Sequence, residues 1–543
     1  MAASNIKQAY WYNFLRSVPR KQLVFTLIFG AIRILLSTAW PYAMYRIIQK
    51  NNQGSQVEIA IYILIVVFLF IAAGLATHKQ ALMNLAIMET FSLNLIERMW
   101  VKINNLDWSI FYGKSRVYFY DLFMVDAWRL RLGMLAFLEL ILVNGLITGV
   151  LILFIAFISL PMFVLCISGI AIMALVQLLS NVRIRAFVKN FHDAWRKQHH
   201  WIARVIDQFN LIKMGRAYLE SEKANTINTK LFLNSNGALL TALSKWRTIN
   251  QAVGNMVRLI IFGTGFYWVH VNYVPLPALM LVLLLISIVQ NNMSQLPGAV
   301  NNFIEGIESQ KSIQDFFNLP EEKDAEILRD IEFKSVEAIS IKAMSFFYGE
   351  KQVINNLDIE LEKGKIYLWR GTNGSGKTTL AHVLLGLLEP KSGELKINGE
   401  ITDWKFLKNL RKRFAFVNQD SPLFTGTVRE NLFFGHPEEE NAFLKMKNNW
   451  LNTLMPNSKQ PENLMVGERG EGLSGGEIRR LVLIREWIRP ADLFILDEPL
   501  NHLDDFAIDE IKREIVNLKA EAIVIIISHQ KGFETIADEI VQF

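Results

Sequence analysis

The chain of 543 residues has almost no cysteine. Its one cysteine, Cys166, lies in an apolar run, so an internal disulfide and a cysteine-rich metal site are both excluded. We expect this thiol to be a small buried side chain. His192, His199 and His200 have no cysteine or carboxylate partner at metal-ligand spacing, and we expect them at solvated helix positions.

Charge is scarce as well. Charged residues make up 20% of the chain and hydrophobic residues 51%, with 36 Phe and 13 Trp. This composition indicates that part of the chain lies in a membrane, and the length indicates several structural units. The formal net charge of +6 is explained by basic loops beside membrane spans, so we expect no nucleic-acid partner.

The N-terminus lacks the features of a cleavable signal peptide. It is polar, aromatic and basic, and it has no small-residue cleavage site. Residues 5–20 mix Tyr, Trp and Phe with Arg and Lys, which is typical of an amphipathic segment in the lipid headgroup region.

Six apolar segments occupy the first half of the chain. Each approaches or exceeds the roughly 20 residues that a membrane helix needs. Pro41 and Pro277 interrupt the first and the last segment, which membrane helices tolerate. The predicted spans are 22–46, 57–78, 132–157, 160–181, 250–271 and 274–297.

The loops between these spans differ strongly in charge. Segments 79–131 and 182–249 are rich in Lys and Arg, whereas the three short loops that alternate with them carry almost none. By the positive-inside rule, the long loops and both termini face the cytoplasm. Apolar residues recur at helical spacing in the long loops, so we expect the membrane helices to continue there and to turn near Ser115–Asp126 and Gly215–Ala217.

Polar residues inside the predicted spans are candidates for function. They are costly against lipid, so they should face a bundle interior or a cavity. Either they line a translocation path, or they pair between helices, for instance Arg33 or Arg258 with Glu139. The candidates are Arg33, Glu139, Asn144, Gln177, Arg258, His270, Gln290 and Asn291.

The composition changes in the second half. Residues 318–335 become polar, which indicates a linker, and short β-like runs, glycine turns and helices follow. We therefore predict a transmembrane domain at 1–317 and a nucleotide-binding domain at 336–543. The expected fold class is an α-helical six-span transmembrane domain plus an α/β P-loop nucleotide-binding domain.

A phosphate-binding loop lies at Gly371–Thr378, with the sequence GTNGSGKT. The apolar run before it predicts a strand, and the run after it predicts a helix. Glycines let the backbone curl around phosphates, so that N–H groups and the helix N-terminus point inward as donors. Lys377 can then reach the β- and γ-phosphates of ATP, and the Thr378 hydroxyl can bind Mg²⁺. The predicted ATP contacts here are Gly371, Asn373, Gly374, Ser375, Gly376, Lys377, Thr378 and Thr379.

Other polar residues lie where predicted strands end. Tyr348 could stack on adenine, and Gln419 could bind Mg²⁺ or the attacking water. Asp497 suits the Mg²⁺ shell, and Glu498 suits polarising that water. His529 could contact the γ-phosphate. Ligand sites in parallel sheets form at such strand ends, and the ordered set is far more specific than any one residue.

One further motif carries a family resemblance. Leu473–Glu477, LSGGE, is similar to the LSGGQ signature of ATP-binding cassette (ABC) proteins. Val466–Gly470 resembles the segment by which exporter-type cassettes contact the membrane domain, and Leu503-Asp504 matches the family's D-loop. The whole chain looks like an exporter-type ABC half-transporter, with a membrane domain fused to one nucleotide-binding domain.

The resemblance implies a head-to-tail homodimer. ATP bound at Lys377 of one copy would be closed over by Ser474, Gly475 and Gly476 of the other, with Asp504 beside them. Closure would convert an inward-facing cavity to an outward-facing one, and hydrolysis would reset it. Glu477 replaces the usual signature Gln, and residues 499–502 differ from the common exporter pattern; neither change removes a catalytic group, so two competent sites are expected.

The expected function is export of an amphipathic drug-like compound, small or modified peptide, or lipid, driven by ATP with Mg²⁺. Uptake of a metal–siderophore complex by the same fold, or a membrane ATPase that regulates without moving cargo, are alternatives. No cysteine-protease segment precedes the spans, so we do not expect a leader-cleaving peptide exporter. The expected location is a bacterial cytoplasmic membrane, in contact with lipid.

Overall fold

The structure, a computed structural model, forms two compact units. The first consists of Met1–Asn105 and Lys114–Leu319, and the second of Leu106–Gly113 and Pro320–Phe543. The structure describes residues 20–50, 56–138, 144–207, 209–215, 218–322, 335–419, 421–434, 461–501, 503–530 and 532–543. Predictions outside this part of the chain concern residues 5–19, Glu139, residues 216–217 and residues 323–334 of the linker.

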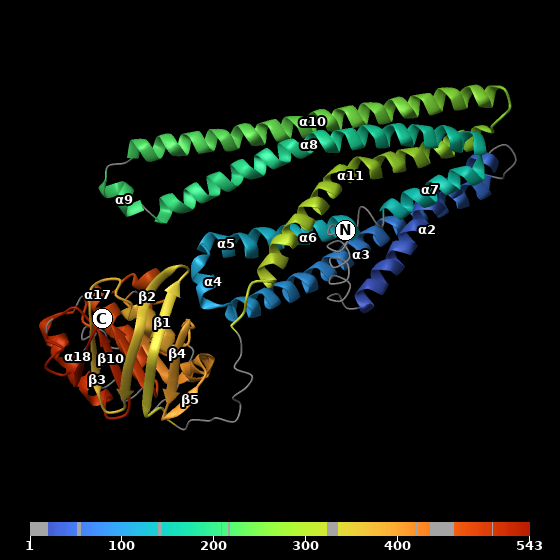
Figure 1. Ribbon diagram of the computed structural model, residues 1–543. Helices are drawn as coiled ribbons and strands as arrows, with labels where there is room; N and C mark the ends of the chain where they lie inside the picture. The colour runs from blue at the N-terminus through green and yellow to red at the C-terminus, as the bar shows by residue number, and fades with distance from the viewer. Residues whose placement is uncertain are drawn as a thin grey trace. The chain divides into compact units, whose positions relative to one another are not determined.

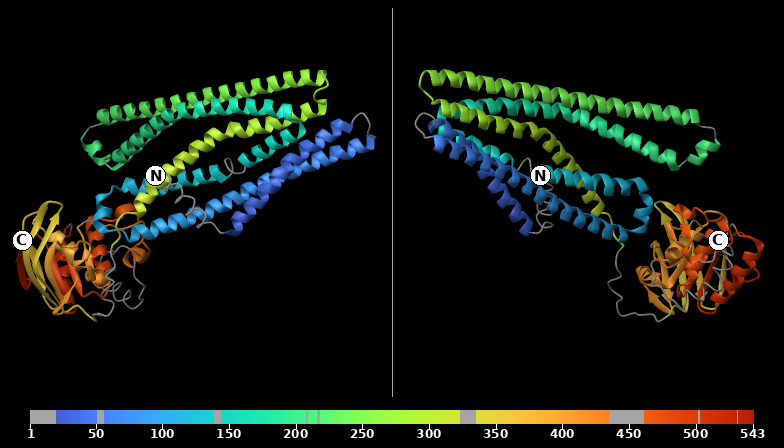
Figure 2. Two further views of the ribbon diagram at one scale, coloured as in Figure 1. Left: turned by 45° about the vertical axis from the view of Figure 1, so that its right-hand side comes forward. Right: turned by 180° about the vertical axis from the view of Figure 1, so that it is seen from behind.

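The first unit is helical, and α8 and α10 lie side by side over most of their length (Figures 1 and 2). Apolar runs of about 20 residues or more recur along this unit, which is the length that a membrane-spanning helix needs. The helices are α2 (Arg20–Lys50), α3 (Gln56–Asn104), α5 (Arg116–Tyr120), a π-helix at Asp121–Asp126, α6 (Ala127–Ala136), α7 (Asn144–Ile158), α8 (Leu160–Asp207), α9 (Phe209–Met214), α10 (Tyr218–His270) and α11 (Leu276–Phe317).

Five helices in the described part of the chain are long and apolar enough to cross a membrane. The predicted span at 132–157 corresponds to the end of α6 and to the shorter apolar helix α7, so the count of six spans is approximate. Large apolar side chains of α3 point outward, such as Leu64 and Phe68, which are 69% and 70% exposed. Lipid stabilises such a surface, whereas water does not. The five helical stretches are Val24–Ile47, Val57–Asn104, Leu160–Ile206, Leu219–His270 and Leu276–Phe317.

The predicted turn at Ser115–Asp126 is wrong. Ser115 caps α5, because its side chain accepts a hydrogen bond from the Tyr118 N–H at 3.2 Å, and the chain stays helical through the π-helix into α6. The chain reverses earlier, between the end of α3 and Ser115. In sequence, a serine that caps a helix looks the same as a serine in a loop. Helical periodicity alone therefore locates the start of a helix poorly.

Two glycines bring α6 and α11 into close contact. A Cβ atom on Gly133 would lie 2.8 Å from the Asn302 carbonyl oxygen and 2.9 Å from the Gly306 Cα. Small residues allow this approach of two helix backbones.

The polar residues of the predicted spans have different surroundings. Arg33 donates to the Gln80 Oε1 at 3.3 Å and to the Asn144 Oδ1 at 3.1 Å, so it joins three helices. His270 is exposed at the end of α10. Gln177, Arg258, Gln290 and Asn291 line a cavity instead.

The structure confirms one prediction on isolated side chains and corrects another. Cys166 is buried with a free thiol. His192 is not solvated, because its Nε2 lies 3.6 Å from the Glu305 carboxylate and the ring is mostly covered. Among the described residues, no group of three or more His, Cys, Asp and Glu side chains could hold a metal ion.

The second unit contains two main sheets. Four strands form an antiparallel sheet in the order β2-β1-β4-β5, and five form a parallel sheet in the order β11-β3-β10-β9-β6. The strands are β1 (Ala338–Tyr348), β2 (Lys351–Glu362), β3 (Ile366–Arg370), β4 (Ser392–Ile397), β5 (Glu400–Thr402), β6 (Phe414–Val417), β9 (Leu493–Asp497), β10 (Ile523–Ile527) and β11 (Glu539–Gln542), besides the short pair β7 (Gly426–Thr427) and β8 (Met465–Val466).

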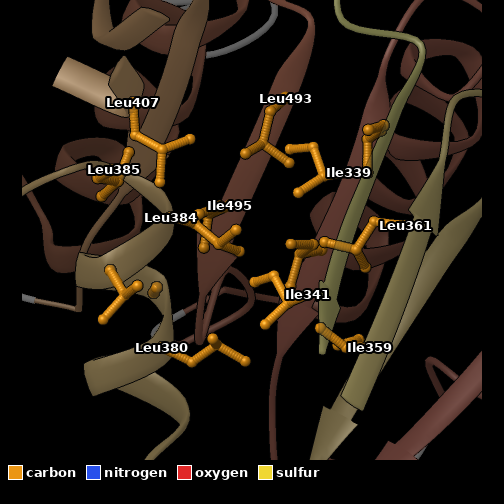
Figure 3. Close-up of a cluster of buried hydrophobic side chains, with 14 of the residues drawn as sticks. Ile339, Ile341, Ile359, Leu361, Leu380, Leu384, Leu385, Leu407, Leu493 and Ile495 are labelled. Atoms are coloured by element: carbon orange, nitrogen blue, oxygen red, sulfur yellow. The ribbon is translucent and has the colours of Figure 1, made fainter. Parts of the chain in front are cut away.

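Helices cover these sheets. Leu380 and Leu384 of α12 face Ile341 of β1 and Ile495 of β9 in one buried cluster (Figure 3). Alternate residues of the buried strands point to the other side, where Leu496 packs in a second cluster with residues of α17 and α18. The helices are α4 (Trp108–Gly113), α12 (Lys377–Leu384), α13 (Leu407–Leu410), α14 (Val428–Leu432), α17 (Gly475–Trp487) and α18 (Asp505–Leu518), with single 3₁₀ turns at Trp404–Phe406, Arg411–Arg413, Pro461–Asn463 and Glu468–Gly470.

The segment Leu106–Gly113 belongs to the second unit. Leu106 pairs with Glu321 in an isolated β-bridge, and the Asp107 N–H donates to the Pro320 carbonyl at 3.2 Å. The Trp108 ring of α4 lies edge-on to His382 of α12, with centroids 5.9 Å apart. Burial lowers the pKa of His382, so this imidazole is held neutral.

Candidate nucleotide-binding site

The phosphate-binding loop lies between β3 and α12. Gly371, Gly374 and Gly376 have φ angles of +154°, +81° and +103°, which L side chains rarely adopt. A Cβ at Gly371 would also lie 2.7 Å from the Phe543 carbonyl oxygen, and one at Gly376 would lie 2.9 Å from the Ile354 side chain. The loop therefore requires glycine, and its backbone can approach a phosphate closely.

Lys377, the first residue of α12, lies over this loop. Its ammonium donates to the carbonyl oxygens of Gly371 at 2.8 Å and Thr372 at 3.0 Å, and to the Ser375 Oγ at 3.3 Å. Burial lowers the pKa of Lys377, while the carboxylates of Asp497 and Glu498 act in the opposite sense. The cation is thus partly desolvated, which strengthens its attraction for a phosphate.

Two acids lie at the end of the buried strand β9: Asp497 is its last residue, and Glu498 comes next. Burial, and next the neighbouring Glu498, raise the pKa of Asp497 to about 6, although Arg479 and Lys377 oppose the shift. The Thr378 hydroxyl hydrogen-bonds the Asp497 carboxylate. A buried carboxylate with a raised pKa is stabilised by a nearby cation.

Glu498 has an unusual backbone. Its φ is +47°, a left-handed conformation that costs a non-glycine residue about 1–2 kcal/mol. This geometry turns its carboxylate toward the loop after β10, where it accepts hydrogen bonds from the Ser528 Oγ and the His529 N–H, both at 3.0 Å. The Glu498 N–H also donates to the Ile527 carbonyl at 2.8 Å. Strain of this kind concentrates at functional sites, and here it fixes the direction of an acid.

Arg479 is a buried residue of this site that the sequence motifs did not indicate. It lies on α17, and its guanidinium donates to the carbonyl oxygens of Asp497 at 2.5 Å and Glu498 at 2.7 Å, with Asn418 at 2.8 Å. The Arg479 side chain thus joins α17 to the backbone at the ends of β6 and β9. In the sequence, Arg479 can be recognised only as an arginine on the apolar side of a helix. That position does not indicate which groups the guanidinium binds.

A cavity of about 670 Å³ collects most of the predicted site residues. It also includes Lys351, Val353, Asn501, Ile527 and Gln530, which the sequence analysis missed, and the Gln530 amide donates to the Asn501 Oδ1 at 3.0 Å. The only indication of these residues in the sequence is that each lies close along the chain to a predicted site residue. The predicted residues that line the cavity are Tyr348, Asn373, Gly374, Ser375, Gly376, Lys377, Thr378, Thr379, Gln419, Asp497, Glu498 and His529.

The start of α17 is absent from the lining of this cavity. Ser474 caps the helix: its Oγ accepts from the Glu477 N–H at 3.2 Å, and its own N–H donates to the Glu477 carboxylate at 2.7 Å. Glu477, the departure from the usual signature, thus completes a capping box. Asp504 caps α18 and pairs with Arg480 at 3.3 Å. Ser474, Gly475, Gly476 and Asp504 therefore contribute nothing to their own chain's cavity.

The residues present fit a nucleotide with a hard cation. The loop offers backbone donors and an ammonium to phosphates. The hydroxyl of Thr378, the carboxylate of Asp497 and the amide of Gln419 offer the oxygen ligands that Mg²⁺ prefers, with phosphates and waters completing its shell. This set of ligands contains one carboxylate, that of Asp497, so the phosphates would supply the remaining negative charge around the cation.

The fold and this cavity together define an ABC-type ATP-binding domain in one chain with long apolar helices. Residues 354–501 match the family model described as ABC transporter. This part of the chain is therefore similar to the ABC transporters, and the same chain contains five helices long and apolar enough, in its described part, to cross a membrane.

Similar proteins carry transporter names. The chain is 27% identical over 301 residues to a probable ABC transporter ATP-binding/permease protein of Haemophilus influenzae, covering 55% of this chain and 54% of that protein. It is 25% identical to a multidrug resistance ABC transporter ATP-binding and permease protein of Lactococcus lactis, covering 62% and 57%. An ATP-dependent lipid A-core flippase of Vibrio parahaemolyticus is 31% identical, covering 37% and 36%. The chain thus matches a little over half the length of the first two relatives.

A solved structure shares the fold over nearly the whole chain. It is a bacterial Atm1-family ABC exporter with ATP bound, with a TM-score of 0.83, 16% identity, and coverage of 96% of this chain and 93% of that one. At this identity the likeness establishes the exporter fold and leaves the cargo open.

Proposed function

We propose that this protein hydrolyses ATP to export an amphipathic small molecule, small or modified peptide, or lipid. It works as a homodimer in a bacterial cytoplasmic membrane, with both termini and the ATP-binding domain in the cytoplasm. The observation that carries the proposal is the cavity that joins the Lys377 loop to Asp497, Glu498 and His529, in a chain with five helices apolar enough to span a membrane. The printed names of the relatives, a multidrug transporter and a lipid A-core flippase, support export of amphipathic cargo.

Each part of the cavity has a role in binding ATP. The Gly371–Thr378 backbone surrounds the phosphates, and the Lys377 ammonium exchanges its carbonyl partners for the β- and γ-phosphate oxygens. Tyr348 at the end of β1 is 51% exposed at the cavity edge, and its ring, which is edge-on to Phe346, stacks on the adenine.

Thr378, Asp497 and Gln419 are the residues that would hold Mg²⁺. The bound cation would neutralise charge on the phosphates and draw Asp497 fully into its ionised form. Because Asp497 lies beside Lys377, the chain offers positive and negative groups to the same nucleotide.

Glu498 is the general base of the proposed reaction. Its carboxylate accepts the proton of the attacking water, and the hydrogen bonds from Ser528 and the His529 N–H keep it aimed. Gln419 helps to orient that water, and the His529 side chain contacts the γ-phosphate.

A second copy completes the site. Since Ser474, Gly475, Gly476 and Asp504 do not line their own cavity, they are available to close over the nucleotide of a partner. The free end of α17 presents N–H donors and a positive helix dipole to the γ-phosphate. Closing and opening of this interface drive the helices between inward- and outward-facing states.

The test is ATP hydrolysis by the purified protein in lipid, measured for the native chain, Glu498→Gln and the exposed control Glu521→Gln. We expect Glu498→Gln to lower the hydrolysis rate by at least about 100-fold, because a general base contributes that much, and to retain nucleotide binding. Glu521→Gln should match the native chain. Full activity of Glu498→Gln would refute the catalytic assignment. ATP hydrolysis without ATP-dependent movement of dansyl-labelled amphipaths into inside-out vesicles would refute export.

A further inference from the structure

The first unit contains a cavity of about 600 Å³ between α8, α10 and α11. Its lining is mostly polar, although apolar side chains such as Met173, Trp246 and Met293 take part. The segments that form it lie at 173–184 and 243–258 and around 290, at the ends of the predicted spans that face the cytoplasm. A solute in the cytoplasm or a headgroup of the inner leaflet can therefore reach this depth.

The charges of this cavity have one sign. Arg247 and Arg258 contribute the charged side chains, and none of the described residues that line it is acidic. The surrounding sequence is equally one-sided, since residues 140–192 and 223–304 contain no Asp or Glu. Arg258 is half-buried and its guanidinium donates to the neutral Asn255 Oδ1, whereas Arg247 is exposed. Near the membrane a half-buried arginine is stabilised by an anion, and these helices supply none along those stretches.

The polar groups form a continuous stripe along α10. Arg247 and Arg258 are 11 residues apart, which is about three turns and places both on one face of the helix. Asn250 and Gly254 lie between them on the same face. The two guanidinium groups therefore lie on the same side of α10, with the Asn250 amide between them.

Side chains from the other two helices complete the stripe. The Asn250 amide donates to the Gln177 Oε1 at 3.0 Å, and the Gln177 amide donates to the Ser180 Oγ at 3.0 Å. The amide of Gln290 covers Gly254 so closely that a Cβ there would lie 2.1 Å from its Nε2. The buried Oε1 of Gln290 has no hydrogen-bond partner in the described structure. Some of this polar lining is hydrogen-bonded within the protein, whereas the Gln290 Oε1 is an acceptor that only an N–H or O–H of a ligand or water can satisfy.

We propose that this cavity binds the anionic group of the cargo, and that the transporter selects amphipaths bearing a carboxylate, sulfonate or phosphate. The inference rests on the proposed export function and specifies its substrate class. Guanidinium groups bind these oxyanions with charge-assisted hydrogen bonds, and the amides donate beside them. The apolar part of the cargo packs against Trp246 and the two methionines.

The experiment measures binding of three dansyl probes by fluorescence anisotropy. The full-length protein is used in phosphatidylcholine nanodiscs without ATP, and the probes are dansylglutamate, neutral dansylamide and cationic dansylcadaverine. The native chain should prefer dansylglutamate. Arg258→Gln and Arg247→Gln should each weaken dansylglutamate binding about tenfold, since each removes charge-assisted hydrogen bonds, and should leave dansylamide binding unchanged.

Two variants keep this result interpretable. Lys245→Gln removes a positive charge from an exposed position on α10 that does not line the cavity, and it should bind like the native chain. Arg258→Lys keeps the charge and should recover part of the affinity. Equal losses in Lys245→Gln and Arg258→Gln, or a native preference for dansylcadaverine or dansylamide, would overturn the proposal.

Nanodiscs that contain phosphatidylglycerol distinguish the two sources of the anion. If the cargo is an anionic lipid, this lipid should displace dansylglutamate from the native chain. If the cargo is a soluble organic anion, dansylglutamate should stay bound. Because probe binding is measured without ATP, a native chain that fails to hydrolyse ATP refutes the proposed function and not the anion preference.

Discussion

Arg479 shows how one side chain can hold the end of a strand in place. The pair Asp497–Glu498 must point into the cavity although Glu498 has a strained backbone. The carbonyl oxygens of both acids accept hydrogen bonds from the buried Arg479 guanidinium. Hydrogen bonds to a charged donor are stronger than neutral ones, so this contact offsets the strain.

Arg479→Ala should therefore destabilise the protein strongly. It leaves the carbonyl oxygens of Asp497 and Glu498 without this donor, at a cost of about 3 kcal/mol or more. We expect a lower thermal unfolding midpoint for the purified variant, and slower ATP hydrolysis because Glu498 loses its fixed direction.

Arg480→Ala is the matched control for this prediction. The neighbouring Arg480 pairs with the exposed carboxylate of Asp504, and an exposed ion pair contributes less than about 1 kcal/mol. Equal midpoints for the two variants would show that Arg479 does not hold the strand end.

The helices of the first unit depend on close packing at small residues. The contact of α6 with α11 places Gly133 against the backbone at Asn302 and Gly306. At this distance the two backbones touch without an intervening side chain, and even one methyl group has no room.

Gly133→Ala should destabilise the first unit by about 1–3 kcal/mol, because overpacking a tight contact forces the backbones apart. Gly298→Ala on α11 is the control, since a Cβ there meets nothing within 4 Å. That change should be neutral, or stabilising by up to about 1 kcal/mol, because alanine favours the helix. Both effects are measured as thermal unfolding midpoints in detergent. A Gly133→Ala protein as stable as Gly298→Ala would contradict the packing argument.

The elements that the sequence could predict are those with local signals. The apolar runs predict the long helices, because burial in lipid needs about 20 apolar residues in succession. The loop at Gly371–Thr378 predicts its own flanking strand and helix, because its glycines are needed at positive φ angles.

The remainder depends on contacts between distant residues. No local pattern indicates that Arg479 binds carbonyl groups at the ends of β6 and β9. Nor does any local pattern indicate that Leu106 pairs with Glu321. The turn predicted at Ser115–Asp126 failed because its residues have helical character, so that a capped helix and a turn look alike in sequence. The cavity of the first unit is a similar case, because its lining comes from three helices.

For the whole molecule, the proposed homodimer requires each nucleotide site to be shared between two copies. The nucleotide cavity contains Lys377, whereas Ser474 lies at the start of α17 outside that cavity. A site that needs both residues must draw them from two copies. Whether two copies share each site can therefore be tested by mixing two variants, without a structure of the dimer.

Mixing two inactive variants should restore activity. Lys377→Ala removes the phosphate-binding ammonium, and Ser474→Arg blocks the end of α17, so each homodimer should lack ATP hydrolysis. In a mixed dimer both defects fall in one composite site, and the other site contains native Lys377 and native Ser474. Random pairing gives about half mixed dimers with one intact site each, so hydrolysis should return to about one quarter of the native rate.

The two variants carry different affinity tags, so that tandem purification isolates the mixed dimers. Photolabelling with azido-ATP then reports nucleotide held at the intact site, even where turnover needs both sites. If Lys377 and Ser474 acted within one chain, both chains of the mixed dimer would be defective, and neither hydrolysis nor labelling would rise above that of the parents. Recovery in the isolated mixed dimer is therefore expected only if the nucleotide lies between two copies, because each copy then repairs the defect of the other.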